Sequence, residues 1–281
     1  MSFRSILGVT LATFLTLALG HYCYVKTIGK TLYKGEDQSV GNTIKLEDYL
    51  YEEQTDGKGL IVGTSLSVYA RHPDLTNLSF SGGTALTVLE ILALKENLPS
   101  VIFVETNFLY RKADQEVVSN FSSKFREKIP LFHDRYRPMS LILGGIAKGN
   151  SDASVVSKVR SKDRIDPEIR RKKIEPQLAS AENEIDQETL DKVIGKLLSL
   201  VKAIEGRGTK LLFYKTPFDP AIAAQPRHKQ WEKALREAFP SHGIQQVVVR
   251  NLETSDGIHL CLDGVLEMGK KLGELAESAE Q

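Results

Sequence analysis

Four polar segments that could take part in chemistry stand far apart in the chain. They contain Ser65, Gly82, Asn107 and the pair Asp256 and His259. A serine hydroxyl is a poor nucleophile until a base takes its proton, and histidine is a residue type that can do so. The residues therefore predict nucleophilic chemistry at Ser65, provided that the fold brings the four segments together.

The elements between these segments predict that they meet. We expect strands at 60–62, 76–79, 101–104, 211–214 and 247–249, and helices at 84–94, 186–204, 228–239 and from about 260 to 276. Strands that alternate with helices favour a mostly parallel sheet covered on both faces. Because the binding crevice of such a sheet lies beyond the carboxyl ends of its strands, we expect the polar segments to converge at one edge.

The four segments resemble, in chain order, the four sequence blocks of the SGNH/GDSL hydrolase superfamily. Gly63-Thr64-Ser65-Leu66-Ser67 is similar to the nucleophile block, usually Gly-Asp-Ser-Leu, and Asn77-Leu78-Ser79-Phe80-Ser81-Gly82 to the second block. Glu105-Thr106-Asn107 is similar to the third block, and Asp256-Gly257-Ile258-His259 to the Asp-x-x-His block. The resemblance covers about residues 58–275, with a long middle segment that does not align.

The resemblance implies a role for each residue and a fold for the domain. Ser65 would be the nucleophile, His259 its general base, and Asp256 the carboxylate that orients His259. The N–H groups of Ser65 and Gly82 and the side-chain amide of Asn107 would form the oxyanion hole. The implied fold is a three-layer α/β/α sandwich with a mostly parallel central sheet, the flavodoxin-like SGNH fold.

Two positions depart from the pattern of the family. Thr64 stands where the nucleophile block usually has aspartate, and Glu105 belongs to a third block that lacks its usual glycine and aspartate. If Glu105 faces the pocket, it could repel anionic substrates or hold a sugar hydroxyl, and if it faces inward it is a structural carboxylate. The nucleophile elbow of α/β-hydrolases is excluded, because its Gly-x-Ser-x-Gly motif needs glycine where Ser67 stands.

The first 25 residues predict a membrane anchor or a signal segment. The run 5–25 has no charged side chain apart from His21 and is long enough to cross a bilayer as a helix. Ala18-Leu19-Gly20 also offers the small residues of a signal cleavage site, so secretion after cleavage is the alternative. We expect the rest of the chain outside the cytoplasm, in the periplasm or the extracellular space. The lysines that follow the run would favour the opposite orientation; these are Lys26, Lys30 and Lys34.

The sequence predicts three segments in order. The anchor or signal segment spans 1–25, a linker or stalk spans 26–57, and an SGNH-like catalytic domain spans 58–281. That domain carries a basic insertion near 150–180, where residues 158–173 include eight basic and three acidic side chains. We expect an exposed or partly disordered loop there. A solvated charge run is the simpler interpretation, and a surface for an anionic polymer or lipid headgroups is the alternative.

Composition sets outer limits on function. The 281 residues are 41% hydrophobic and 26% charged, as in a globular domain. The 37 Lys and Arg nearly balance the 36 Asp and Glu, so the overall charge does not indicate a nucleic-acid partner. The two cysteines, Cys23 and Cys261, imply no disulfide framework. No residues have the spacing of metal ligands, and we expect neither a metal nor a cofactor.

Together these features predict an esterase or O-acyltransferase that forms an acyl-enzyme on Ser65. Resemblance to membrane-tethered SGNH domains makes esters, and above all O-acetyl groups of envelope glycans, the expected substrates, and it allows a membrane-bound acyl-transfer partner. The alternative is a catalytically inactive SGNH-like domain that binds glycan or a membrane partner. The departures at Thr64 and Glu105 motivate this alternative.

Overall fold

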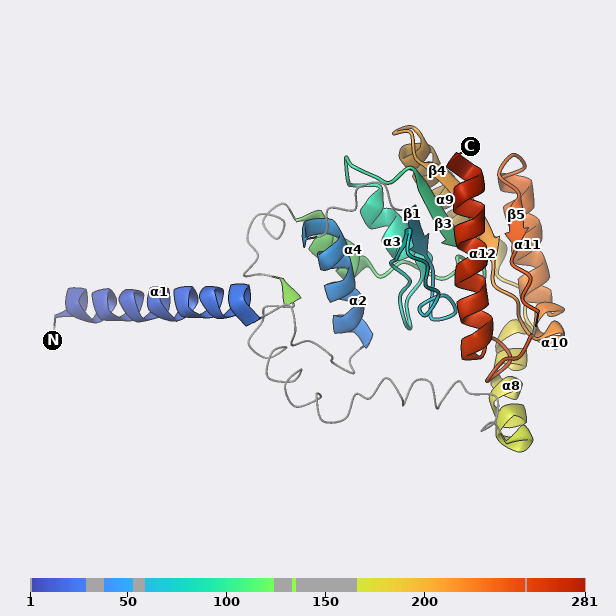
Figure 1. Ribbon diagram of the computed structural model, residues 1–281, viewed down its shortest axis with the longest axis horizontal. Helices are drawn as coiled ribbons and strands as arrows, with labels where there is room; N and C mark the ends of the chain where they lie inside the picture. The colour runs from blue at the N-terminus through green and yellow to red at the C-terminus, as the bar shows by residue number, and fades with distance from the viewer. Residues whose placement is uncertain are drawn as a thin grey trace.

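A computed structural model describes residues 2–28, 38–52, 59–123, 133–134, 166–250 and 252–280. It contains a five-stranded sheet surrounded by helices (Figure 1). The strands are β1 (Gly59–Val62), β2 (Leu75–Asn77), β3 (Val101–Glu105), β4 (Lys210–Lys215) and β5 (Ile244–Gln246). The helices are α1 (Phe3–Ile28), α2 (Gln38–Glu47), the π-helical turn η2 (Asp48–Glu52), α3 (Ala85–Leu92), α4 (Gln115–Ser122), α8 (Pro167–Ala181), α9 (Gln187–Glu205), α10 (Pro220–Ala223), α11 (Pro226–Ala238) and α12 (Leu262–Glu280).

The sheet is parallel throughout, with the strand order β2-β1-β3-β4-β5. The predicted α/β class with a parallel sheet is therefore confirmed. The connection from β1 leads outward to the edge strand β2, and the connection from β2 returns across β1 to β3. The strand order therefore reverses between β1 and β3. Ligands of open α/β sheets bind beyond the carboxyl ends of the strands at such a reversal.

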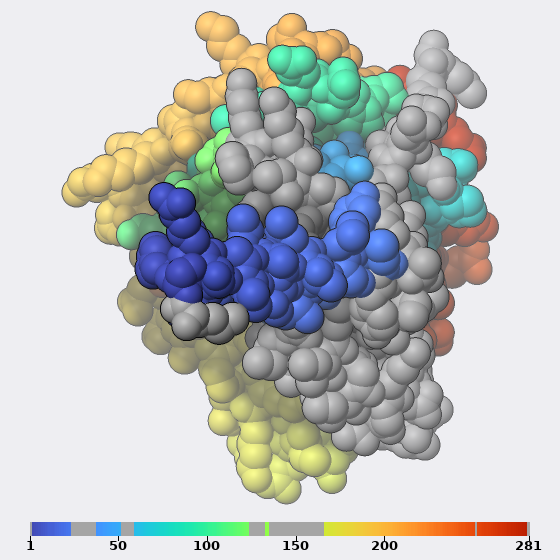
Figure 2. All heavy atoms as spheres, turned by 90° about the vertical axis from the view of Figure 1, so that its left-hand side faces the viewer, coloured from blue at the N-terminus to red at the C-terminus, as the bar shows by residue number. Residues whose placement is uncertain are grey.

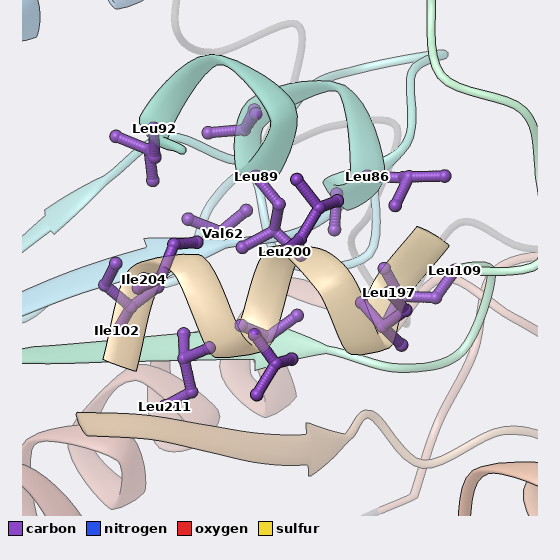
Figure 3. Packing of buried hydrophobic residues seen from close by; sticks show 14 of the residues in the cluster. Val62, Leu86, Leu89, Leu92, Ile102, Leu109, Leu197, Leu200, Ile204 and Leu211 are labelled. Atoms are coloured by element: carbon purple, nitrogen blue, oxygen red, sulfur yellow. The ribbon is translucent and has the colours of Figure 1, made fainter. Parts of the chain in front are cut away.

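Both faces of the sheet are buried, which explains the continuous apolar runs of the strands. On one face, leucines of α3 and α9 meet over Val62, Ile102 and Leu211 (Figure 3). On the other face, Phe103 and Tyr214 pack in a second cluster with side chains of α12. Successive strand residues therefore point alternately into two separate cores.

The fifth strand differs from its prediction. Apolar residues 247–249 were expected to form it, but β5 is Ile244–Gln246. Val247 still donates its N–H to the carbonyl of Lys215, and Val247 and Val249 are buried in the α12 cluster. Val248 between them is 74% exposed. The apolar run therefore fills the core just beyond the end of the strand, and the prediction of a strand at 247–249 is wrong.

Several helices begin at an aspartate, as expected for residues that satisfy free N–H groups of the first turn. Asp114, Asp166, Asp186 and Asp219 accept such hydrogen bonds at the starts of α4, α8, α9 and α10. Proline follows at the first helical position of α8 and α10, where its missing N–H costs nothing. Local sequence signals thus fix where these helices begin.

The N-terminal segment is one apolar helix, α1, which extends away from the rest of the protein (Figure 1). Its span Phe3–Cys23 is long and apolar enough to cross a membrane or to be a signal sequence, and none of its apolar window is buried.

The segment after α1 is not simply a stalk. Residues 38–52 form α2 and η2, and Leu46 and Tyr49 are buried in the same core as α3. The prediction of a linker over 26–57 is therefore wrong for these residues, because their apolar side chains complete a core cluster. Residues 29–37 and 53–58 lie outside the described part of the chain.

The basic insertion also differs from its prediction. Residues 150–165 lie outside the described part of the chain, but the C-terminal part of the insertion forms the helix α8. Basic side chains of α8 pair with acidic ones one turn away, as Arg171 does with Glu175 and Lys172 with Glu168. In Figures 1 and 2, α8 forms the lower end of the protein. An exposed loop is therefore the wrong description of this part.

Candidate active site

The nucleophile candidate Ser65 lies on a turn directly beyond β1. The N–H of Ser67 donates to the carbonyl of Thr64, at 3.1 Å, and the N–H of Phe80 donates to the carbonyl of Gly63, at 3.0 Å. The second bond holds the loop after β2 beside the turn after β1. The first two sequence blocks are therefore neighbours in space, as predicted from their places at adjacent strand ends.

The structure brings Ser65, His259 and Asp256 together in one hydrogen-bonded chain. Ser65 Oγ lies 2.8 Å from His259 Nε2, and His259 Nδ1 lies 2.7 Å from Asp256 Oδ2. With its Nδ1–H donated to Asp256, His259 can accept the hydroxyl proton of Ser65 at Nε2. The side chains of His259 and Asp256 are 22% and 18% exposed, so solvent reaches the site.

The loop from Asp256 to His259 builds its own geometry. Asp256 Oδ1 accepts hydrogen bonds from the N–H groups of Ile258, at 3.2 Å, and His259, at 2.8 Å. Burial alone would raise the pKa of the Asp256 carboxyl, but hydrogen bonds and charge from His259 outweigh it and hold the pKa below its usual value. The spacing of three residues thus lets one carboxylate orient both the backbone and the ring of His259.

Gly257 in this loop could not be another residue without strain. Its φ of +92° lies in the left-handed region, and a Cβ there would overlap the side chain of Ile222. The N–H of Asp219 donates to the carbonyl of Gly257, at 2.8 Å, and fixes the loop against α10. The tight loop is therefore set by sequence, packing and a backbone hydrogen bond together.

Arg170 of α8 supports the same loop, and sequence reasoning missed it. Its Nε donates to the carbonyl of Thr254, at 3.1 Å, and its guanidinium pairs with Asp219 Oδ2, at 3.0 Å. Ile174, one turn later, packs against the apolar cluster that contains Leu66. The basic composition of the segment obscured this role, and the isoleucine at a helical spacing from Arg170 was the available signal.

Gly82, the predicted backbone donor of the oxyanion hole, ends the loop after β2. Its φ of +69° lies in the left-handed region, which glycine adopts without strain because it has no Cβ. The contact between Phe80 and Gly63 keeps the loop beside the nucleophile turn. The structure therefore places the loop that carries Gly82 beside the turn that carries Ser65, and donation from Gly82 to an oxyanion stays a prediction.

Asn107, the predicted side-chain donor, is engaged elsewhere. Its Nδ2 donates to the carbonyl of Thr216, at 2.7 Å, and its Oδ1 accepts from the N–H of Thr216, at 2.8 Å. In the part of the chain that the structure describes, the Asn107 side chain makes no hydrogen bond to a triad residue. It connects the ends of β3 and β4, and only the second hydrogen of its amide is left for an oxyanion.

One face of α2 contacts the loop that leads to Gly82. Asn42 makes two hydrogen bonds to the backbone of Ser81, with Nδ2 to the carbonyl at 2.9 Å and Oδ1 from the N–H at 3.1 Å. Lys45 Nζ donates to the carbonyl of Ser79, at 2.8 Å, and burial lowers the pKa of Lys45 to about 8. These residues, three apart on a helix, share one face. Sequence reasoning missed them because they lie in the predicted stalk.

Glu105, the residue that departs from the third block, faces inward. Its side chain is fully buried beneath the nucleophile turn. The alternative in which it faces the pocket and meets substrate is therefore wrong.

One buried histidine outside the triad, His228, lies among aromatic rings. His228 of α11 is buried between the rings of Phe108 and Phe218, and burial lowers its pKa to about 4. It is therefore neutral at physiological pH. No three His, Cys, Asp or Glu side chains of the described ranges are grouped so that they could hold a metal ion.

In comparisons with known proteins, no family model, no curated protein and no solved structure matched the chain. Its function is therefore inferred from the geometry and chemistry of its own residues.

Proposed function

We propose that the protein is a serine-dependent ester hydrolase or O-acyltransferase that works through an acyl-enzyme on Ser65. The observation that carries the proposal is the hydrogen-bonded chain from Ser65 through His259 to Asp256, with contacts of 2.8 and 2.7 Å. Ser65 and His259 are 194 residues apart in the sequence. They meet beyond β1, where the strand order reverses. The order of roles in the chain is that of a nucleophile, a base and an orienting carboxylate.

The first half of the reaction would acylate Ser65. The Ser65 oxygen attacks the carbonyl carbon of the ester while its proton moves to His259 Nε2, and the carbonyl oxygen becomes an oxyanion. The bond from this carbon to the leaving oxygen then breaks, and the proton on His259 passes to that oxygen. Asp256 stabilises the positively charged His259 between the two transfers.

The second half would release the acyl group. Water or a sugar hydroxyl attacks the acyl carbon, gives its proton to His259 Nε2, and displaces the Ser65 oxygen, which regains the proton. Attack by water gives hydrolysis, and attack by a sugar hydroxyl gives transfer.

The wider proposal adds a fold and a setting. The strand order 2-1-3-4-5 is that of the flavodoxin-like doubly wound sheet, which supports the three-layer SGNH-type fold. We propose that α1 anchors the catalytic domain outside the cytoplasm, with cleavage of α1 as a signal peptide and secretion as the alternative. O-acetylated envelope glycans are the proposed substrates, and a membrane-bound acyl-transfer protein is a proposed partner.

A fluorophosphonate probe tests the chemistry directly, because it labels activated serines. The full chain in detergent is incubated with the probe, and the modified peptide is identified by mass spectrometry. We expect one adduct on Ser65 that is absent in Ser65→Ala. Failure of the folded protein to react would remove the proposal.

Acetyl transfer distinguishes the two forms of the reaction. The protein is given p-nitrophenyl acetate with and without a polysaccharide acceptor, and acetate and acetylated carbohydrate are measured separately. An acyltransferase forms acetylated carbohydrate faster than free acetate. A hydrolase gives acetate alone.

The inactive binding domain remains the second candidate, and the position of Asn107 favours it. Its side chain is occupied by Thr216 instead of facing Ser65. The absence of a Ser65 adduct, together with retention on immobilised glycan, would support this candidate over the enzyme.

A further inference from the structure

Glu105 is a carboxyl group buried in the floor of the candidate active site. Its side chain has no solvent-accessible surface and lies at the end of β3, next to β1. Burial raises the pKa of the Glu105 carboxyl, while hydrogen bonds from Ser67 and Thr64 act in the opposite direction. A carboxyl group without solvent is costly unless such partners satisfy it, so its position requires a reason.

Within the described part of the chain, the hydrogen bonds to the Glu105 carboxylate come from the nucleophile turn. Glu105 Oε2 accepts from the N–H of Thr64, at 3.0 Å, and from Ser67 Oγ, at 2.5 Å. Glu105 Oε1 accepts from Thr64 Oγ1, at 2.7 Å. The carboxyl group therefore holds both the residue before Ser65 and the residue two positions after it.

A second layer fixes this contact. Tyr214 of β4 donates from its hydroxyl to Ser67 Oγ, at 2.7 Å, so that Ser67 is held between Tyr214 and Glu105. Gly63 leaves the space that the carboxyl group needs, since a Cβ at this position would lie 2.7 Å from Glu105 Oε2. Three neighbouring strands thus contribute to one buried polar network beneath Ser65.

The two departures from the family pattern are in direct contact. The nucleophile block has Thr64 in place of an aspartate, and the third block carries Glu105 in an unusual position. The structure joins these positions, 41 residues apart, by two hydrogen bonds. A carboxyl group missing from the nucleophile turn is thus supplied to that turn from the end of β3.

We propose that Glu105 is the positioning residue of the nucleophile. By holding Thr64 and Ser67, it sets where the hydroxyl and the N–H of Ser65 lie relative to His259 and to the oxyanion. This inference rests on the proposed function and adds a determinant of its rate. A displacement of about 1 Å at a reacting group can lower a rate about 100-fold, so a residue that contacts no substrate can still control turnover.

The rate of fluorophosphonate labelling per folded molecule tests this role, because a residue needed only for stability would not change it. In Glu105→Gln, one acceptor oxygen becomes an NH₂ group that faces donors of Thr64 or Ser67. We expect a labelling rate constant at least about ten-fold lower in the full chain in detergent, with the folded fraction measured by near-ultraviolet circular dichroism. A wild-type rate in the folded variant overturns the proposal.

Glu90→Gln is the matched control. Glu90 is also a buried carboxylate, but its side chain pairs with Gln115 of α4 and Lys196 of α9, and among the described residues it makes no hydrogen bond to the nucleophile turn. We expect its labelling rate to equal that of the wild type. A fall equal to that of Glu105→Gln would show a general effect of buried charge and overturn the proposal.

Three further variants decide the question if Glu105→Gln does not fold. Ser67→Ala removes one donor and breaks the link to Tyr214, and Thr64→Val removes another while Thr64→Ser keeps it. Slower labelling in Ser67→Ala and Thr64→Val, with recovery in Thr64→Ser, supports the role of the network. Wild-type rates in all three overturn it. A wild type that does not label removes the proposed function and this inference together.

Discussion

The nucleophilic half and the oxyanion half of the candidate site lie at the same sheet edge but are held differently. In the first, Ser65, His259 and Asp256 already contact one another at 2.7–2.8 Å. In the second, Gly82 is placed by its backbone, and the Asn107 amide is bonded to Thr216. The first half is therefore assembled, and in the second the Asn107 side chain keeps only one amide hydrogen for an oxyanion.

The difference shows that a side chain can lie at the predicted sheet edge and still use its polar atoms to hold the backbone and not to bind a ligand. His259 Nδ1 is bonded to Asp256, so Nε2, which faces Ser65, is the ring nitrogen that can accept a proton. The N–H and the carbonyl of Thr216 are buried and need hydrogen-bond partners, and the Asn107 side chain supplies an acceptor to one and a donor to the other.

The largest effect is expected from removing the nucleophile or the base. Ser65→Ala and His259→Ala should each lower kcat for p-nitrophenyl acetate by about 10⁶-fold, and the double variant should be no worse, because the two act as one unit. Steady-state kinetics of the three proteins checks this. Turnover that survives in either single variant would locate the reaction elsewhere.

Asp256→Asn should have the next largest effect. The amide can leave His259 in place but favours the wrong tautomer, and such a change lowers kcat by about 10⁴-fold. The crystal structure or circular dichroism of the variant should be unchanged while kcat falls. A variant with nearly full activity would mean that Asp256 does not orient His259.

Asn107→Ala tests the half that is only partly assembled. Loss of both contacts leaves the buried N–H and carbonyl of Thr216 unpaired and should lower the free energy of unfolding by about 2 kcal/mol. If the second amide hydrogen serves the oxyanion, kcat should also fall by about 100-fold.

Gln230→Ala is the control for Asn107→Ala. Gln230 makes the same two-way contact, to the N–H and carbonyl of Ile185, at 2.7 and 2.9 Å, on α11. It should lose stability and keep kcat. If Asn107→Ala behaves in the same way, Asn107 is a structural clamp and the oxyanion assignment is wrong.

The smallest effect is expected at Lys45, which contacts the loop of the oxyanion half. Its pKa is about 8 in the folded protein and 10.5 ordinarily, so between these values the unfolded chain holds more protons. The free energy of unfolding of the wild type, relative to Lys45→Met, should therefore rise with pH over this window, by on the order of 2 kcal/mol. Urea denaturation from pH 7 to 10.5 measures it, and a constant difference would contradict the burial of the charged amine.

The sequence allowed the sheet and the nucleophilic half to be predicted because their signals are local. The run 101–104 is short and apolar, which favours burial, and Asp256 and His259 lie within one tight loop. The partnership of Thr64 with Glu105 could not be predicted, since it joins residues 41 positions apart that each look like a simple departure from a motif. The places of α2 and α8 were missed because polar and charged residues dominate both segments, and the contacts of Leu46, Asn42 and Arg170 join parts of the chain that lie far apart in the sequence.

The short connection between α1 and α2 limits how far the candidate site can lie from a membrane. Nine residues separate Ile28 from Gln38. Even fully extended, that connection spans no more than about 36 Å. With α1 in a bilayer, the α2 face that contacts Ser81 stays within this tether length of the lipid surface. Acceptors held at the membrane would then meet the site at a local concentration set by their number per unit area, which a soluble polymer could match only at a high bulk concentration.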